Sequence, residues 1–208
     1  MKLFIVSSGV CLFAAALVSA QEVPKFTFNI GAGFTRPAGN TGTHLDTGWN
    51  VQGGVGYNFS PYLGANVNLA FNDLGITSAD LSRIGVPGGD VHILSATLDP
   101  IVHLNPHGHI DFYVTGGGGL FRWYQEFTRP AVAIVPGFDP YFGFSSAAVP
   151  TTQVLSSYSA NRPGFDIGAG VAVGALGRGK IFAEAKYDHI YMKGSHADYI
   201  PVTFGFRW

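Results

Sequence analysis

Period-two alternation between apolar and small polar side chains runs through most of this chain and constrains its fold more than any other feature. In the segment KFTFNIGAGFT (residues 25–35), every second residue from Phe26 to Phe34 is apolar, whereas Thr, Asn and Gly occupy the positions between them. Because successive side chains of a strand point to opposite faces, this alternation predicts β-strand and not amphipathic helix.

Eight segments follow the same pattern, which predicts an all-β chain. The expected strands cover residues 25–35, 49–59, 63–72, 91–104, 110–119, 165–174, 181–188 and 200–208. Short connections made of turn-forming residues are expected at Ser60-Pro61, Asn105-Pro106-His107-Gly108 and Gly177-Arg178-Gly179. Longer connections are expected near residues 36–46, 73–90, 125–160 and 193–198. Short turns that alternate with longer loops are typical of an up-and-down barrel in a membrane, with the short turns on the periplasmic side.

The composition of the two strand faces distinguishes a membrane barrel from a soluble one. Only 12% of the residues are charged, whereas a soluble surface carries roughly 25–35% charged residues. The apolar face holds Phe, Leu, Ile and Val, with Trp or Tyr toward the strand ends, as a lipid-facing belt with aromatic girdles does. The Gly, Asn, Thr and Ser of the other face suit the interior of a narrow barrel. We therefore predict an eight-stranded antiparallel up-and-down transmembrane β-barrel, with a soluble barrel as the alternative.

The first twenty residues have the features of a secretory signal peptide. Lys2 is their only charge, an apolar run follows, and the small residues Val18-Ser19-Ala20 end the segment. We expect cleavage before Gln21, which leaves residues 21–208 as the barrel domain in the outer membrane of a bacterium. A signal anchor that stays in the membrane is the alternative, but its apolar run is short for a spanning helix.

Composition also excludes several classes of protein. The net charge is −1 and no run of like charges is present, so binding of nucleic acid through a charged patch is not expected. The single cysteine, Cys11, cannot form an internal disulfide, which excludes a disulfide scaffold and a zinc ribbon.

The C-terminal segment YIPVTFGFRW, residues 199–208, alternates apolar residues and ends on an aromatic residue. With the segment AEAKY at 183–187, it resembles the small eight-stranded outer-membrane β-barrels, the family that includes the transmembrane domain of outer-membrane protein A. The resemblance implies that Phe204, Phe206 and Trp208 form the signal that the barrel assembly machinery recognises, although a terminal Phe is commoner than Trp. We expect no periplasmic domain after the barrel.

Sequence motifs for catalysis or metal binding are weak. Ser195, His196 and Asp198 are close in sequence, but neighbouring residues of a strand or loop tend to point apart. Three histidines near residues 103–109 surround a tight turn with Pro106 and Gly108, which is more typical of a solvated turn than of a metal site. We therefore expect no enzyme activity, no metal and no cofactor.

Charged residues on the polar face of the strands are expected inside the barrel. Asp99, Glu184, Lys186, Asp188 and Arg207 share this parity. Because an unpaired charge is costly in a confined interior, they should pair, and Glu184 should come near the level of Arg207. Two interpretations stay open: a charge network that fills the lumen, or a gate whose ion pairs exchange partners.

Loops are where a specific function is expected in a barrel of this kind. The connection at 125–160 is long and apolar, and Phe138, Tyr141, Phe142 and Phe144 are candidates for binding an external surface. In the 73–90 connection, residues 78–83 predict one helical turn with Ser78 as its N-cap.

These observations together favour a non-enzymatic outer-membrane protein that is structural or binds an external ligand through its loops. The alternative is a small passive, porin-like pore for ions or small solutes. The interior of an eight-stranded barrel is just wide enough for side chains to fill, which makes an open channel the less expected state. The expected partners are outer-membrane lipid and the barrel assembly machinery, while the extracellular ligand stays unidentified.

Overall fold

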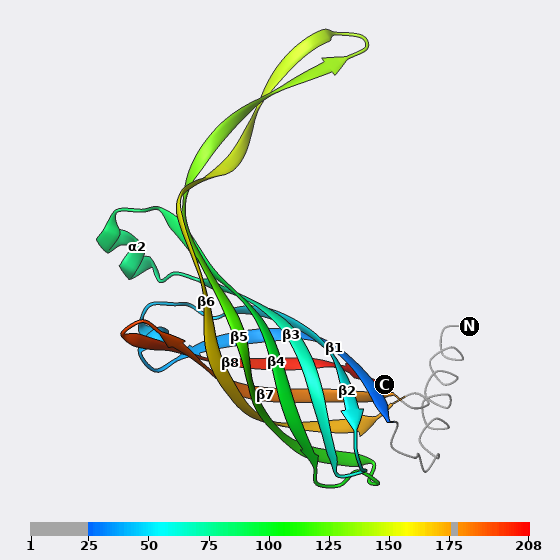
Figure 1. Cartoon of the computed structure of the whole chain (residues 1–208). Helices are drawn as coiled ribbons and strands as arrows, with labels where there is room; N and C mark the ends of the chain where they lie inside the picture. Colours follow the sequence, from blue (N-terminus) through cyan, green and yellow to red (C-terminus); the bar gives the residue numbers. More distant parts are fainter. Residues whose placement is uncertain (1–24, 176–178) are drawn as a thin grey trace, which may run out of the picture.

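Eight antiparallel strands close into a barrel in the computed structural model of this chain (Figure 1). The strands are β1 (Phe26–Ala38), β2 (Gly48–Asn58), β3 (Leu63–Gly75), β4 (Gly88–His103), β5 (Ile110–Asp139), β6 (Gly143–Gly174), β7 (Lys180–Met192) and β8 (Ser195–Arg207). Each strand pairs with its neighbour in chain order, and β8 pairs with β1 to close the ring. The predicted up-and-down topology is confirmed.

The structure describes residues 25–175 and 179–208. The predicted signal peptide, residues 1–20, and two residues of the last predicted short turn, Gly177 and Arg178, lie outside the described part. Within that part, the helices are η1 (Gly39–Thr43) and α2 (Ser78–Ile84), and none is long and apolar enough to cross a membrane.

The alternation in the sequence becomes an alternation of exposure. Along β1, Phe28 and Ile30 are exposed on the outside of the barrel, whereas Thr27 and Asn29 point inward and are buried. The apolar face therefore points outward on all sides, where a soluble protein would place polar groups. This arrangement matches a barrel surrounded by lipid.

Aromatic side chains gather on the outer face at both ends of the barrel. At the end of the barrel that holds Trp208, Phe26 packs edge to face on Tyr57, with ring centroids 5.1 Å apart. At the other end, Trp49, Phe71 and His92 follow one another across β2, β3 and β4, with centroid distances of 5.5 Å and 5.7 Å. Two aromatic belts thus border the apolar band, as expected for the two membrane interfaces.

The prediction of a loop over residues 125–160 is wrong. β5 and β6 continue as a paired ribbon far beyond the barrel, with a register shift between Phe127 and Thr128, and the last bridge joins Asp139 to Gly143 (Figure 1). Four prolines in this segment pointed to irregular structure. In a two-stranded ribbon each strand has a free edge, and a proline whose missing N–H faces that edge removes no ladder hydrogen bond.

Two further connections differ from their predictions. The connection between β7 and β8 is a turn of Lys193 and Gly194, not a loop over 193–198, and the positive φ of Gly194 (79°) permits the tight reversal. The predicted helical turn is present as α2, but its N-cap is Thr77 and not Ser78. The Thr77 hydroxyl donates to the Asp80 carboxylate at 3.4 Å, so it does not cap the backbone.

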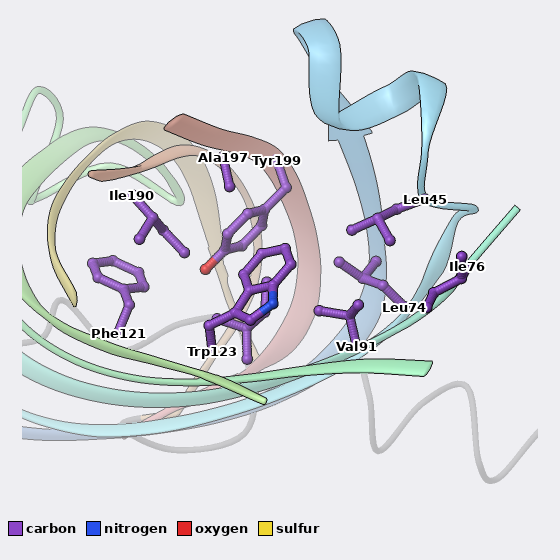
Figure 2. Close-up of a cluster of buried hydrophobic side chains, with 10 residues drawn as sticks. Leu45, Leu74, Ile76, Val91, Phe121, Trp123, Ile190, Ala197 and Tyr199 are labelled. Atoms are coloured by element: carbon purple, nitrogen blue, oxygen red, sulfur yellow. The ribbon is translucent and has the colours of Figure 1, made fainter. Parts of the chain in front are cut away.

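The interior is not polar throughout, a feature that the sequence interpretation missed. An apolar cluster fills the end of the lumen next to η1 and α2, which is the end that the short-turn rule predicts to be extracellular (Figure 2). Its buried members are Leu45, Leu74, Ile76, Val91, Ile93, Phe121, Trp123, Ile190, Ala197 and Tyr199. A second, smaller cluster of Ile101, Tyr113, Ala172 and Phe182 lies toward the periplasmic end. The polar middle of the lumen is therefore enclosed between two apolar layers.

Candidate functional site

Lys186 of β7 is the centre of the charged network in the lumen. Its ammonium group lies 2.6 Å from Asp99 Oδ2 and 3.5 Å from Asp166 Oδ1. The same Asp99 oxygen accepts hydrogen bonds from Asn68 Nδ2 at 2.6 Å and Thr97 Oγ1 at 3.0 Å. All five side chains are buried. Because burial of a charge is costly, the three donors that share this one oxygen are what makes the arrangement stable.

Neutral hydrogen bonds fill the opposite side of the lumen. Asn50 donates to the Thr35 hydroxyl at 3.0 Å, Thr35 donates to Asn72 Oδ1 at 2.6 Å, and Thr203 donates to Asn50 Oδ1 at 2.9 Å. Between this group and Lys186, a cavity of about 20 Å³ remains. That volume holds about one water molecule. The middle of the lumen is therefore packed with side chains.

Carboxylates outnumber ammonium groups at this level. Asp188 is buried and forms no ion pair within residues 25–175 and 179–208. Neither oxygen of Asp166 accepts a hydrogen bond from the described part of the chain. Asp166 shares the inward parity of the predicted charges, and parity alone could have added it to the network.

Arg207 and Glu184 lie within ion-pair distance of each other. Arg207 Nη2 lies 4.0 Å from Glu184 Oε2, and Gln52 Nε2 donates to Glu184 Oε1 at 3.3 Å. The two residues are not at one level, because the register places Glu184 opposite Thr203. The contact is made by the length of the arginine side chain.

The Arg207 guanidinium is held mainly by aromatic rings. Its central carbon lies 4.6 Å from the centroid of Tyr113 and 5.3 Å from that of Phe182. Both rings are almost fully buried. Such cation–π contacts strengthen when water is excluded, and both rings belong to the smaller apolar cluster of the lumen.

Ser195, His196 and Asp198, which are close in sequence but were not expected to form a catalytic site, all lie on β8. Asp198 Oδ1 lies 2.6 Å from His189 Nδ1, and Asp198 Oδ2 lies 3.4 Å from His196 Nε2. The backbone N–H of Asp198 donates to Thr41 Oγ1 at 3.0 Å. Ser195 hydrogen-bonds neither imidazole in the part of the chain that the structure describes. The cluster joins the hairpin to η1.

The three histidines near the β4–β5 turn have separate partners. His103 Nδ1 lies 2.6 Å from Asp111 Oδ2, which also lies 3.5 Å from Lys180 Nζ. The His107 ring packs against Tyr62, with centroids 6.1 Å apart. Among the described residues, no group of three or more His, Cys, Asp or Glu side chains is arranged to hold a metal ion.

The last residue of the chain takes part in barrel closure. Trp208 exchanges two backbone hydrogen bonds with Phe28, of 2.8 Å and 3.0 Å, and its ring stacks on that of Phe28. Phe204 and Trp208 are exposed on the outer face, and Phe206 is half-buried. The three aromatic residues of the predicted assembly signal thus lie along the β1–β8 seam.

The four candidate surface-binding residues lie at the end of the β5–β6 ribbon and are called here the aromatic tip. Phe138 is 66% exposed, Tyr141 91%, and Phe142 and Phe144 88% each. Phe138 and Phe144 pack on each other across the ribbon, with centroids 5.1 Å apart. The ribbon holds the tip well away from the barrel (Figure 1).

Comparison with known proteins gives the same architecture. A family model described as outer membrane protein beta-barrel domain matches residues 4–207. Neisserial surface protein A is similar in structure, with TM-score 0.58 and 14% identity, over 90% of this chain and 98% of that chain. A major outer membrane protein from Thermus thermophilus is similar with TM-score 0.59 and 13% identity, over 88% of this chain and 98% of that chain. No curated protein sequence matches this chain. At these identities the structural similarity shows the fold alone.

Proposed function

The chain belongs to the outer membrane protein beta-barrel domain family, and we propose that this bacterial outer-membrane barrel is a non-enzymatic protein that binds an external surface through its β5–β6 ribbon. The observation that carries the proposal is the aromatic tip. Four large aromatic side chains are exposed together at the end of a paired ribbon, far from the lipid-facing band. Contiguous exposed aromatic residues of this kind are typical of contact surfaces.

The ribbon suits this role because its backbone is hydrogen-bonded almost to the tip. Strand pairing continues from the barrel wall to the bridge between Asp139 and Gly143. A paired ribbon presents the tip in a defined arrangement, so that less conformational entropy is lost on binding than with an irregular loop. The partner we propose is an apolar or lipid surface, because the tip carries aromatic rings.

The packed interior argues against the alternative of a passive pore. The cavity at the level of Lys186 holds about one water molecule, and apolar clusters lie above and below it. The layer of Arg207, Tyr113 and Phe182 narrows the periplasmic end further. The polar side chains of the interior therefore pack against one another and leave no open path for ions.

The contacts of Asp198 support the non-enzymatic part of the proposal. Its carboxylate binds His189 and His196, and its amide binds Thr41, so it serves to connect β7, β8 and η1. A nucleophile needs a base within hydrogen-bond reach, and Ser195 lacks one within the described ranges.

Adhesion of cells that display the protein tests the proposal. The four tip residues are replaced together by Ser, and cells are applied to a supported phosphatidylcholine bilayer and to polystyrene. We expect the wild type to adhere several-fold better than the tip variant on at least one of the two surfaces.

The matched control replaces Val132 and Ile134 by Ser. Both side chains are exposed, at 68% and 74%, but lie on the shaft of the ribbon and not at its tip. This control should adhere like the wild type. Equal adhesion of the tip variant and the wild type, at equal amounts of protein on the cell surface, would refute the proposed role of the tip.

A further inference from the structure

A cavity of about 570 Å³ lies at the extracellular end of the barrel, between η1, α2 and the ends of β4 to β8. Its floor is apolar and consists of members of the ten-residue apolar cluster described above, among them Leu45, Ile76, Val91 and Trp123 (Figure 2). Ligand pockets commonly have volumes of about 300–1,000 Å³ and mostly apolar walls with a few placed polar groups. Both the size and the floor of this cavity fall within that description.

Two cationic side chains in the wall of the cavity, Arg162 and Lys193, form no ion pair with any described residue. Arg162 of β6 donates from Nη2 to the Tyr158 hydroxyl at 3.4 Å, while its Nε is buried without a hydrogen-bond partner in the described part of the chain. Lys193 of the β7–β8 turn also lines the cavity and forms no ion pair within residues 25–175 and 179–208. A buried donor without an acceptor is costly, so the Arg162 site favours an acceptor that comes from outside the chain.

The acidic group of the wall is already neutralised. Asp80 of α2 lines the cavity and lies 2.5 Å from His44 Nδ1 and 3.5 Å from Arg83 Nη1. The charges of Arg162 and Lys193 are therefore left unbalanced at the rim, above an apolar floor. This combination is complementary to a molecule with an anionic head and an apolar tail.

We propose that this cavity binds a single-chain anionic amphiphile of the fatty-acid class. The acyl chain lies against the floor formed by Trp123, Val91 and Ile76, and the carboxylate is bound by Arg162 and Lys193. The ligand comes from the external medium past the loops, because strand pairing closes the barrel wall on all sides. This binding activity goes beyond the proposed role of the aromatic tip and involves none of its residues.

Quenching of Trp123 fluorescence tests whether the acyl chain enters the cavity. The full-length mature protein is placed in phosphatidylcholine nanodiscs and titrated with brominated dodecanoate. We expect saturable quenching that is lost in Trp123→Phe. Trp49 and Trp208 face outward and are about half exposed, so they report the non-saturable background from ligand dissolved in the bilayer. Quenching that does not saturate, or that persists unchanged in Trp123→Phe, would overturn the proposal.

The head group is tested by Arg162→Gln, with dodecanoate and dodecanol as the two ligands. Loss of a charged hydrogen bond should weaken dodecanoate binding by roughly tenfold or more, and dodecanol binding should change little. Arg122→Gln is the matched control. Arg122 lies on β5 opposite Asn161, one residue from Arg162, but its side chain points outward. Equal weakening of both ligands in Arg162→Gln would overturn the assignment of an anionic head group.

A second head-group variant and a series of chain lengths also test the proposed ligand. If Arg162→Gln does not give the heat-modifiable gel shift of a folded barrel, Lys193→Gln is used with the same expectation, since Lys193 is exposed in a turn. Each added methylene should tighten binding about fourfold in a series from octanoate to dodecanoate. A flat series, or displacement of dodecanoate by dioleoyl phosphatidate in the disc, would contradict a single-chain ligand.

Discussion

Replacement of Lys186 by Met should destabilise the folded barrel more than any other single charge removal in the lumen. The ammonium group is 2.6 Å from Asp99, and at an effective dielectric constant of about 20 this gives an attraction of about 6 kcal/mol before desolvation. Met removes the charge but keeps most of the volume. Asp99 and Asp166 would then remain buried without a counter-charge, which costs about 3–5 kcal/mol.

Urea unfolding in detergent micelles measures this cost. Lys180→Met is the control, because Lys180 is 26% exposed near the rim and its partner Asp111 keeps its contact with His103. The control should lose about 0–1 kcal/mol. The double variant of Lys186→Met with Asp99→Asn should lose less than the sum of the two single variants. Additivity within about 0.5 kcal/mol, or equal costs for Lys186→Met and the control, would show that the pair is not the centre of the network.

Two further predictions concern packing and pH. Gly117→Ala should cost about 1–3 kcal/mol in the same unfolding experiment, because the added Cβ would overlap the Leu98 carbonyl oxygen. Gly174→Ala is the control and should cost little, since a Cβ at Gly174 has open space. Similar losses for both variants would disprove the close approach at Gly117. In the extracellular loops, the hydrogen bond from His44 holds the pKa of Asp80 below its ordinary value of 3.8. The stability that this contact gives is therefore present above pH 3.8 and is lost as the pH falls through the lowered pKa. An NMR titration of Asp80 should show a midpoint below 3.8 that rises toward 3.8 in His44→Ala, and an unchanged midpoint would refute the contact.

The barrel could be predicted from the sequence because the pattern that specifies its strands is visible within short segments. The period of two, visible in single segments such as 25–35, decides which side chains face lipid and which face the lumen. The same parity places Lys186 and Asp99 inside, although it does not give their distance. Their contact depends on the register across the ring, which no single segment contains.

The features that could not be predicted depend on contacts between distant segments. The prolines of 125–160 concealed the β5–β6 ribbon, because whether a proline faces a free edge depends on the pairing. Val91 and Ile93 have the inward parity of β4 and could have signalled an apolar layer. The cavity above that layer could not be inferred, since its walls come from η1, α2 and the ends of five strands, β4 to β8.

Planar-bilayer recording of the purified barrel tests the central claim most directly, namely that the lumen is closed and that function resides in the extracellular parts. The packed layer around Lys186 and the two apolar clusters predict no steady conductance above the leak of the bilayer. Reproducible single-channel currents that rise linearly with voltage, in protein shown to be folded by its gel shift, would contradict the account and favour a passive pore.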